Sequence, residues 1–248
     1  MDGFSFQRDI VPLVTLDFNG AKPSLVRYEG TAFLIAARVI VTCWHCVAVE
    51  RPGHRFCALI TAAENDVTYH PLSNVAKDAN GADLATASVD LMPTIGLELG
   101  GDVLTGTNVY TYGYPLTRQE RTPDGPVRME VIGQYLRSYV TRICTHSHGQ
   151  FAPMRSYELG MAAHKGLSGA PLLELQSKRV VGVIYGNNDY EQIEEFASID
   201  PTTQARTPEV RRILSYGLAC HTESLHNLTG PATRNLPLHA YCASTMRA

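Results

Sequence analysis

Short apolar runs, separated by polar and turn-forming residues, dominate the hydrophobic pattern of this chain. Most are about 5–8 residues long, as expected for strands, and they are rich in Val, Ile, Tyr and Thr. The runs are IVPLVTLDF (10–18), TAFLIAARVIVT (31–42), RFCALIT (55–61), DLATASVD (83–90), NVYTYGYP (108–115), VIGQYLRSYVTRI (131–143), APLLEL (170–175) and RVVGVIYG (179–186). An Asn-Gly turn follows the first of them, which is typical of a hairpin. The pattern predicts an all-β protein.

Helical periodicity is confined to two segments near the C-terminus. TPEVRRILSY, beginning at Thr207, and HTESLHNL, in which Thr222 is expected to cap the start, are predicted to be helical. A glycine-rich stretch, MPTIGLELGGD (92–102), divides the strands into two groups. We therefore expect two β domains, residues 1–95 and residues 96–248, the second ending in a helical tail.

Composition and charge exclude several classes of partner. The chain has 248 residues, 44% of them hydrophobic, and its net charge of −3 provides no basic field for nucleic acid or a membrane surface. Its uncharged apolar stretches are shorter than the ~18 residues of a membrane span. Asp2, Arg8 and Asp9 stand where a secretory signal needs a basic start and an apolar run, so we expect a cytoplasmic protein. The six cysteines are then expected to be free thiols, and no cofactor or metal is predicted.

The stretch VTCWHCV (41–47) allows three chemistries. Cys43 and Cys46 could form a redox dithiol, but no βαβ pattern surrounds them. A zinc site could use both cysteines with His54 and Cys57, although it would leave the glycine-rich motifs downstream unexplained. In the third interpretation His45 is the catalytic group and the thiols are incidental.

A histidine, an aspartate and a serine follow one another at strand edges: His45, Asp83 in GADLATASVD and Ser168 in HKGLSGAPLLE. A serine hydroxyl attacks a carbonyl only when an imidazole takes its proton, and a carboxylate must orient that imidazole. Asp78 and Asp90 lie nearby, but neither precedes an apolar strand as Asp83 does. The N–H groups of Gly166 and Ser168 could together form an oxyanion hole, and Gly169 would leave room for a substrate chain.

These motifs resemble those of the chymotrypsin-like, or trypsin-like, serine peptidases, in a plain bacterial style. The resemblance covers residues 11–220 and rests on GTAFLI and VIVTCWHC, DLATASV, GLSGAPLL and VVGVIYG. It implies two six-stranded antiparallel β-barrels with a C-terminal helix. The roles that it implies are general base for His45, orienter for Asp83, nucleophile for Ser168, oxyanion donors for Gly166 and Ser168, and pairing with the substrate backbone for Ile184, Tyr185 and Gly186.

The same resemblance places Ala162 at the base of the primary specificity pocket, with no charge to select Arg or Lys. Gly186, on the opposite wall, is expected to leave the entrance open. We therefore expect an uncharged residue before the scissile bond, with His164 donating a hydrogen bond to a polar one. The competing hypothesis is that Asp189 folds back and supplies a negative charge.

Two departures from the family pattern carry information. Many secreted members bridge the cysteine after the histidine to a residue about fifteen positions earlier, but here Cys46 would meet Gly30. Members activated by N-terminal cleavage have an aspartate before the serine, and this chain has Leu167. No N-terminal cleavage is therefore expected to be required.

The sequence thus predicts a serine endopeptidase that acts on a protein or peptide substrate through an acyl-enzyme, under the control of a regulatory partner or effector. One alternative is a catalytically silent, peptidase-like binding module. Another is an α/β-hydrolase esterase, because GLSGA nearly fits the nucleophile elbow and Ser168, then Asp189 or Asp200, then His221 occur in the required order.

Overall fold

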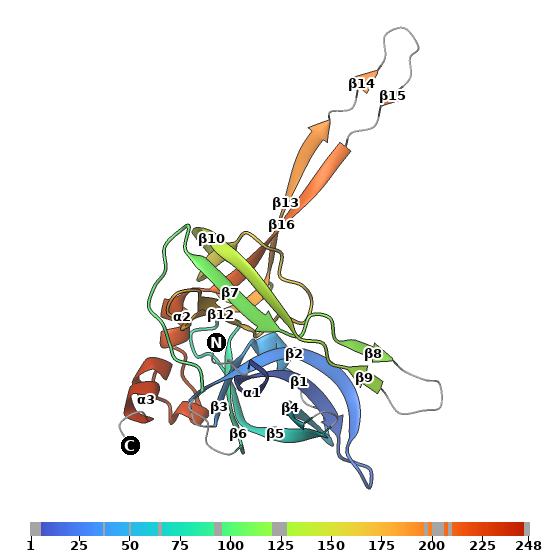
Figure 1. The fold of residues 1–248 in the computed structure, drawn as a ribbon, viewed down its shortest axis with the longest axis vertical. Coiled ribbons are helices and arrows are strands. Elements are labelled where there is room, and N and C mark those ends of the chain that lie inside the picture. Colours follow the sequence, from blue (N-terminus) through green and yellow to red (C-terminus); the bar gives the residue numbers. More distant parts are fainter. Residues whose placement is uncertain are drawn as a thin grey trace.

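The computed structural model describes residues 6–36, 38–49, 51–63, 66–91, 96–120, 128–195, 198–199, 206–207 and 210–245. Within them nearly all regular structure is β-strand, so the all-β prediction is confirmed (Figure 1). A short helix, α1 (Phe6–Asp9), leads into the first strand.

Six strands form a closed antiparallel barrel in the order β1-β2-β3-β6-β5-β4. They are β1 (Ile10–Asp17), β2 (Ser24–Ala36), β3 (Val39–Thr42), β4 (His54–Ala63), β5 (Asp66–Lys77) and β6 (Ala85–Val89). The run 31–42 is divided between β2 and β3 by a turn in which Arg38 has a φ of 69°. The apolar residues of these runs, Phe33 and Ile40 among them, are buried in one hydrophobic cluster.

Six later strands form a second antiparallel sheet in the order β10-β11-β16-β13-β12-β7, and β10 pairs with β7, so the order returns to its start. They are β7 (Asn108–Gly113), β10 (Gln134–His146), β11 (Met154–Leu159), β12 (Pro171–Glu174), β13 (Val180–Glu195) and β16 (Val210–Cys220). Between β7 and β10 in the sequence, β8 (Arg118–Glu120) and β9 (Arg128–Glu130) form a separate two-stranded sheet. All strands of the barrel precede residue 96, and all strands of the second sheet follow it. The domain boundary proposed there stays a prediction.

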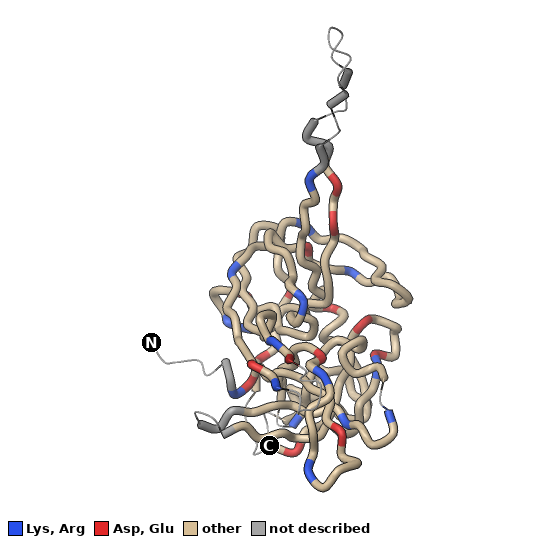
Figure 2. Tube along the Cα trace, turned by 90° about the vertical axis from the view of Figure 1, so that its right-hand side faces the viewer, with Lys and Arg blue, Asp and Glu red and all other residues tan. Residues whose placement is uncertain are grey.

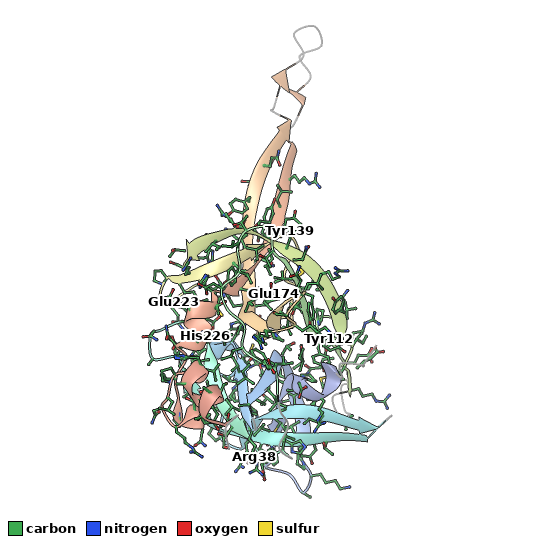
Figure 3. The ribbon with its side chains drawn as sticks, turned by 60° about the vertical axis from the view of Figure 1, so that its left-hand side comes forward. Arg38, Tyr112, Tyr139, Glu174, Glu223 and His226 are labelled. Carbon is green, nitrogen blue, oxygen red and sulfur yellow. The ribbon has the colours of Figure 1, made fainter. Side chains whose placement is uncertain are left out.

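β13 and β16 extend beyond the second sheet as a projecting arm that also carries β14 (Ser198–Ile199) and β15 (Arg206–Thr207) (Figure 1). Figure 3 shows Tyr139 near the base of the arm and Arg38 at the opposite end of the molecule. The helix predicted from Thr207 is wrong, because β16 pairs with β13 from Val210 onward. Long-range strand pairing overrides the local helical pattern.

The C-terminal tail connects the two sheets. Helix α2 (Thr222–His226) packs against β11 and β13, a 3₁₀ turn (Pro231–Thr233) lies against β5 and β6, and helix α3 (Leu238–Thr245) packs on β2. The predicted tail helix is therefore present, but its cap is His221, whose ring accepts a hydrogen bond from the backbone N–H of Glu223. Thr222 is instead buried, with its hydroxyl bonded to the carbonyl of Val181.

Basic and acidic residues are interspersed over the body of the molecule (Figure 2). No helix in the described ranges has the length and apolar character needed to cross a membrane.

Candidate active site

Strand pairing brings His45 and Asp83 together, although they are 38 positions apart. His45 lies in a 3₁₀ turn (Trp44–Cys46) directly after β3, and Asp83 lies just before β6. β3 and β6 are antiparallel neighbours, with Thr42 opposite Ala85, so the end of one strand meets the start of the other. Nδ1 of His45 lies 2.6 Å from Oδ2 of Asp83, and the backbone N–H of His45 donates to Oδ1 at 3.0 Å.

This pair lies at the edge of the buried core. Asp83 is fully buried, whereas the side chain of His45 is 35% exposed. Burial lowers the pKa of His45, but hydrogen bonds to Asp83 and Cys46 and the nearby negative charge raise it, and the net result is a pKa of about 10. An ionised carboxylate only accepts hydrogen bonds, so Nδ1 donates to Asp83 and Nε2 is left for other chemistry.

The turn that carries Ser168 is held against β2 of the barrel. The backbone N–H of Thr31 donates to the carbonyl of Ser168 at 2.9 Å, and the Thr31 hydroxyl donates to the carbonyl of Gly166 at 2.7 Å. Gly169 has a φ of +85°, and a Cβ there would lie 2.0 Å from the carbonyl oxygen of Thr31. Only glycine allows this close approach of the turn to the barrel.

The N–H groups of the turn divide into two sets. Those of Leu167, Gly169 and Ala170 donate to the carbonyls of His164, Ile184 and Leu167, respectively. Within the described ranges, the N–H groups of Gly166 and Ser168 donate to no protein acceptor. These are the two groups that the sequence predicts as oxyanion donors.

The two cysteines beside His45 contact the second sheet. The thiol of Cys43 donates to the carbonyl of Ile184 at 3.2 Å, and the thiol of Cys46 donates to the carbonyl of Ser168 at 3.7 Å. Both are buried free thiols, and burial raises the pKa of Cys43 well above its ordinary value. These contacts place the residue after His45 against the backbone of Ser168.

Of the three residues predicted to pair with substrate, Ile184 is already engaged within the protein. Its carbonyl accepts hydrogen bonds from Gly169 and Cys43, and its N–H donates to Ala170. Tyr185 is also buried, and its hydroxyl bonds to that of Ser156 at 2.9 Å. Gly186 follows a bulge in the pairing of β13 with β16.

The predicted pocket residue Ala162 is half-buried, and His164 is exposed. Between them Ala163 is held by Asn187, whose side chain accepts from its N–H at 2.6 Å and donates to its carbonyl at 2.9 Å. A Cβ at Gly217 would lie 2.8 Å from the carbonyl oxygen of Met161. Segment 161–163 therefore packs closely against the β13–β16 pair, an arrangement that local sequence did not indicate.

The open entrance expected at Gly186 stays a prediction, and His148 lies beside this position. His148, in the loop between β10 and β11, has its Cε1 atom 3.2 Å from the position of a Cβ on Gly186. Its ring lies 6.1 Å from the ring of His45 and 5.5 Å from that of Tyr185, between centroids. Sequence reasoning missed His148 because it occupies a turn-rich loop 103 positions beyond His45, with no motif around it.

The structure argues against two of the alternatives. Cys57 packs with Val14, Leu16 and Leu59, in a different cluster from Cys43 and Cys46, so the four-ligand zinc set is not assembled. The described residues bring together one group with metal-ligating atoms, Cys43, His45 and Asp83, within 4.8 Å of one another. Its donors are already hydrogen-bonded, because Asp83 accepts from His45 and Cys43 donates to Ile184.

The α/β-hydrolase interpretation is wrong, because the chain has no layer of helices around a parallel sheet in its described ranges. His221, its candidate base, is buried as a helix cap and packs on the ring of Tyr157 at 4.7 Å. Asp189 is exposed on the arm, and Asp200 lies outside the described residues.

The sequence matches a known protein-family model. Residues 30–183 match the family model of the trypsin-like peptidase domain. No curated protein sequence gives a match.

Solved structures with the same fold are numerous. The active form of the Rv3671c protease from M. tuberculosis is 16% identical, with a TM-score of 0.56 over 89% of this chain and 79% of that one. The MamO protease domain from Magnetospirillum magneticum is 14% identical, with a TM-score of 0.52 over 86% of this chain and 92% of that one. The HtrA-type protease AlgW with a decapeptide is 13% identical, with a TM-score of 0.56 over 96% of this chain and 65% of that one.

Proposed function

The chain belongs to the trypsin-like peptidase family and is a hydrolase of the serine-protease class, and we propose that it is an endopeptidase whose triad is His45, Asp83 and Ser168. The observation that carries this assignment is the double hydrogen bond from His45 to the buried carboxylate of Asp83. It fixes both the backbone and the ring of the histidine, as a general base requires.

In the proposed reaction, the Ser168 hydroxyl attacks the carbonyl carbon of the scissile bond while its proton passes to Nε2 of His45. The resulting oxyanion accepts hydrogen bonds from the N–H groups of Gly166 and Ser168. Nε2 then gives the proton to the leaving amine, and an acyl-enzyme remains. Water, deprotonated by the same histidine, hydrolyses the ester and restores Ser168.

The substrate chain pairs with β13 as an added strand at Tyr185 and Gly186, next to Ala162 and His164. The N–H and carbonyl of Ile184 are both hydrogen-bonded within the protein, so Ile184 positions the site and does not itself pair with the substrate. Its carbonyl ties β13 to Gly169 of the nucleophile turn and to Cys43 beside the base, so the parts of the site are held in register.

The substrate is a specific protein, and a partner or effector controls its cleavage. This part of the proposal is supported by the damage that an unrestricted endopeptidase would cause among folded and unfolded proteins around it. The HtrA-type relative bound to a decapeptide shows that one protein of this fold takes a peptide of that length.

Labelling with a fluorophosphonate tests the assignment, because the reagent requires an activated serine. The wild-type protein should be labelled on Ser168, and Ser168→Ala and His45→Ala should be neither labelled nor able to cleave peptides, while their circular dichroism spectra stay unchanged. A folded wild-type protein that resists labelling would instead identify a silent binding module. Normal hydrolysis by Ser168→Ala would contradict the triad.

A further inference from the structure

The loop between β10 and β11, residues 147–153, extends from the second sheet to the barrel beside the proposed site. The N–H of Ala152 donates to the carbonyl of Gly81 at 3.1 Å, two residues before Asp83. The ring of Phe151 stacks on that of His148, 6.2 Å between centroids with a 9° angle between planes. Nζ of Lys77, in β5, lies 4.8 Å from the centre of the Phe151 ring. The loop is thus supported from both sheets, and His148 has a defined place.

His148 lies beside His45, the proposed general base, and beside Gly186 in β13. The ring of His148 covers Gly186, where the absence of a side chain gives it room. It also lies 6.1 Å from the ring of His45. A substrate side chain bound beside Gly186 would therefore lie close to the imidazole of His148.

The imidazole of His148 can form further hydrogen bonds. Its ring makes aromatic contacts, but neither ring nitrogen has a hydrogen-bond partner within the described ranges. By contrast, Nδ1 of the nearby His146 lies 3.4 Å from the hydroxyl of Tyr185. A half-buried imidazole with unbonded nitrogens can bind an acceptor side chain that enters beside it.

The charges around the loop favour an acidic side chain. Nζ of Lys77 lies over the ring of Phe151, so this loop has a positive charge beside it. The carboxylate of Asp83 already accepts two hydrogen bonds from His45. The carboxylate of Asp78 accepts a hydrogen bond from the N–H of Ala82. A carboxylate that enters beside His148 could accept a hydrogen bond from its imidazole, and Lys77 adds a positive charge to the same loop.

We propose that His148 is a specificity-determining residue that selects an acidic side chain immediately before the scissile bond. This inference rests on the proposed function, because it assumes cleavage at Ser168. It replaces the uncharged preference that an open entrance at Gly186 would give.

Cleavage of a proteome-derived peptide library, read by mass spectrometry, tests the proposal with wild type, His148→Ala and His148→Gln. Wild type should cleave mainly after Glu and Asp. In His148→Ala the ratio of kcat/KM for matched Glu and Leu peptides should fall at least about tenfold, as expected when a charge-assisted hydrogen bond is lost. His148→Gln, which keeps a hydrogen-bond donor at this position, should retain activity on Gln peptides.

Gln150→Ala is the matched control, since Gln150 is exposed in the same loop. It should leave the cleavage profile unchanged, and fluorophosphonate labelling of the His148 variants should stay within about twofold of wild type if the triad is intact. An unchanged profile in His148→Ala, a uniform increase on all peptides, or wild-type cleavage after Lys and Arg would overturn the proposal and leave the triad standing. A wild-type protein that neither cleaves nor labels would overturn both.

Discussion

The thiol of Cys46 donates a hydrogen bond to the backbone carbonyl of Ser168, 122 positions further along the chain, over 3.7 Å. Cys43 makes the corresponding contact to Ile184 at 3.2 Å. The two cysteines that flank His45 therefore each join the barrel to the second sheet. This arrangement favours the interpretation in which His45 is the catalytic group and the two thiols have a structural role.

Replacing either cysteine should affect stability more than catalysis. Cys43→Ala and Cys46→Ala each remove a buried thiol and its hydrogen bond, which should lower the free energy of unfolding by about 1–2 kcal/mol. Urea denaturation measures this change, and kcat should stay within about threefold of wild type. Stoichiometric zinc in the purified protein, or activity that requires a disulfide, would show instead that the thiols are the functional groups.

Gly30 should be intolerant of a side chain. It has a φ of +154°, and a Cβ there would lie 2.8 Å from both Sγ of Cys46 and the carbonyl oxygen of Ser168. Gly30→Ala should displace the nucleophile turn and lower kcat/KM at least about 100-fold, because small displacements of reacting groups are costly. Gly106→Ala is the control, since Gly106 also has a positive φ, +87°, but no atom lies within 4 Å of its Cβ position. Equal activity in the two variants would count against the argument.

Asp83→Asn should lower kcat by about 10⁴-fold, because an amide can stabilise the wrong tautomer of His45. As a base, His45 must be neutral, so kcat/KM of the wild type should rise with pH, with a midpoint above the ordinary histidine pKa of 6.5. A pH profile of peptide hydrolysis measures both effects. A midpoint at or below 6.5 would contradict the role of Asp83.

The same pair should make stability depend on pH. The folded-state pKa of His45 is raised from 6.5 to about 10, so the native state binds the proton more tightly than the unfolded chain does. This contribution to the free energy of unfolding is fully present below pH 6.5 and is lost as the pH rises through about 10. Urea denaturation between these limits should show the decline, and Asp83→Asn should reduce it. If the free energy of unfolding declined as steeply in Asp83→Asn as in wild type, the decline would have to come from groups other than His45.

Leu167 should order the nucleophile turn by packing. It is fully buried, and a Cβ on Gly113 would lie 2.8 Å from its Cδ2 atom. Leu167→Ala should therefore cost about 2–5 kcal/mol of unfolding free energy. Leu116→Ala, at a side chain that is 49% exposed, should cost far less.

The uncleaved chain should also react with a fluorophosphonate, because Leu167 has no carboxylate to receive a new N-terminus. Mass spectrometry of the labelled protein measures its length and the modified residue together. Labelling that appears only after proteolysis near the N-terminus would refute this expectation.

Local sequence was sufficient for the strands and for the order of the candidate triad. Runs such as IVPLVTLDF and RVVGVIYG became β1 and the start of β13, because short apolar runs rich in β-branched residues specify strands without distant information. His45, Asp83 and Ser168 could be proposed as a triad because each lies in a short motif at a strand edge. The cytoplasmic location, the domain boundary and the control by a partner stay predictions.

Contacts between distant segments were decided only by the tertiary structure. The apolar spacing in TPEVRRILSY fits a helix, yet β16 is a strand because β13 supplies a partner for its backbone. The thiols of Cys43 and Cys46 gained their acceptors only when the second sheet packed against the barrel. His148 reached Gly186 through a loop whose sequence carries no periodic signal. Hydrogen bonds and ring contacts of this kind depend on which surfaces meet in space, and spacing along the chain does not encode that.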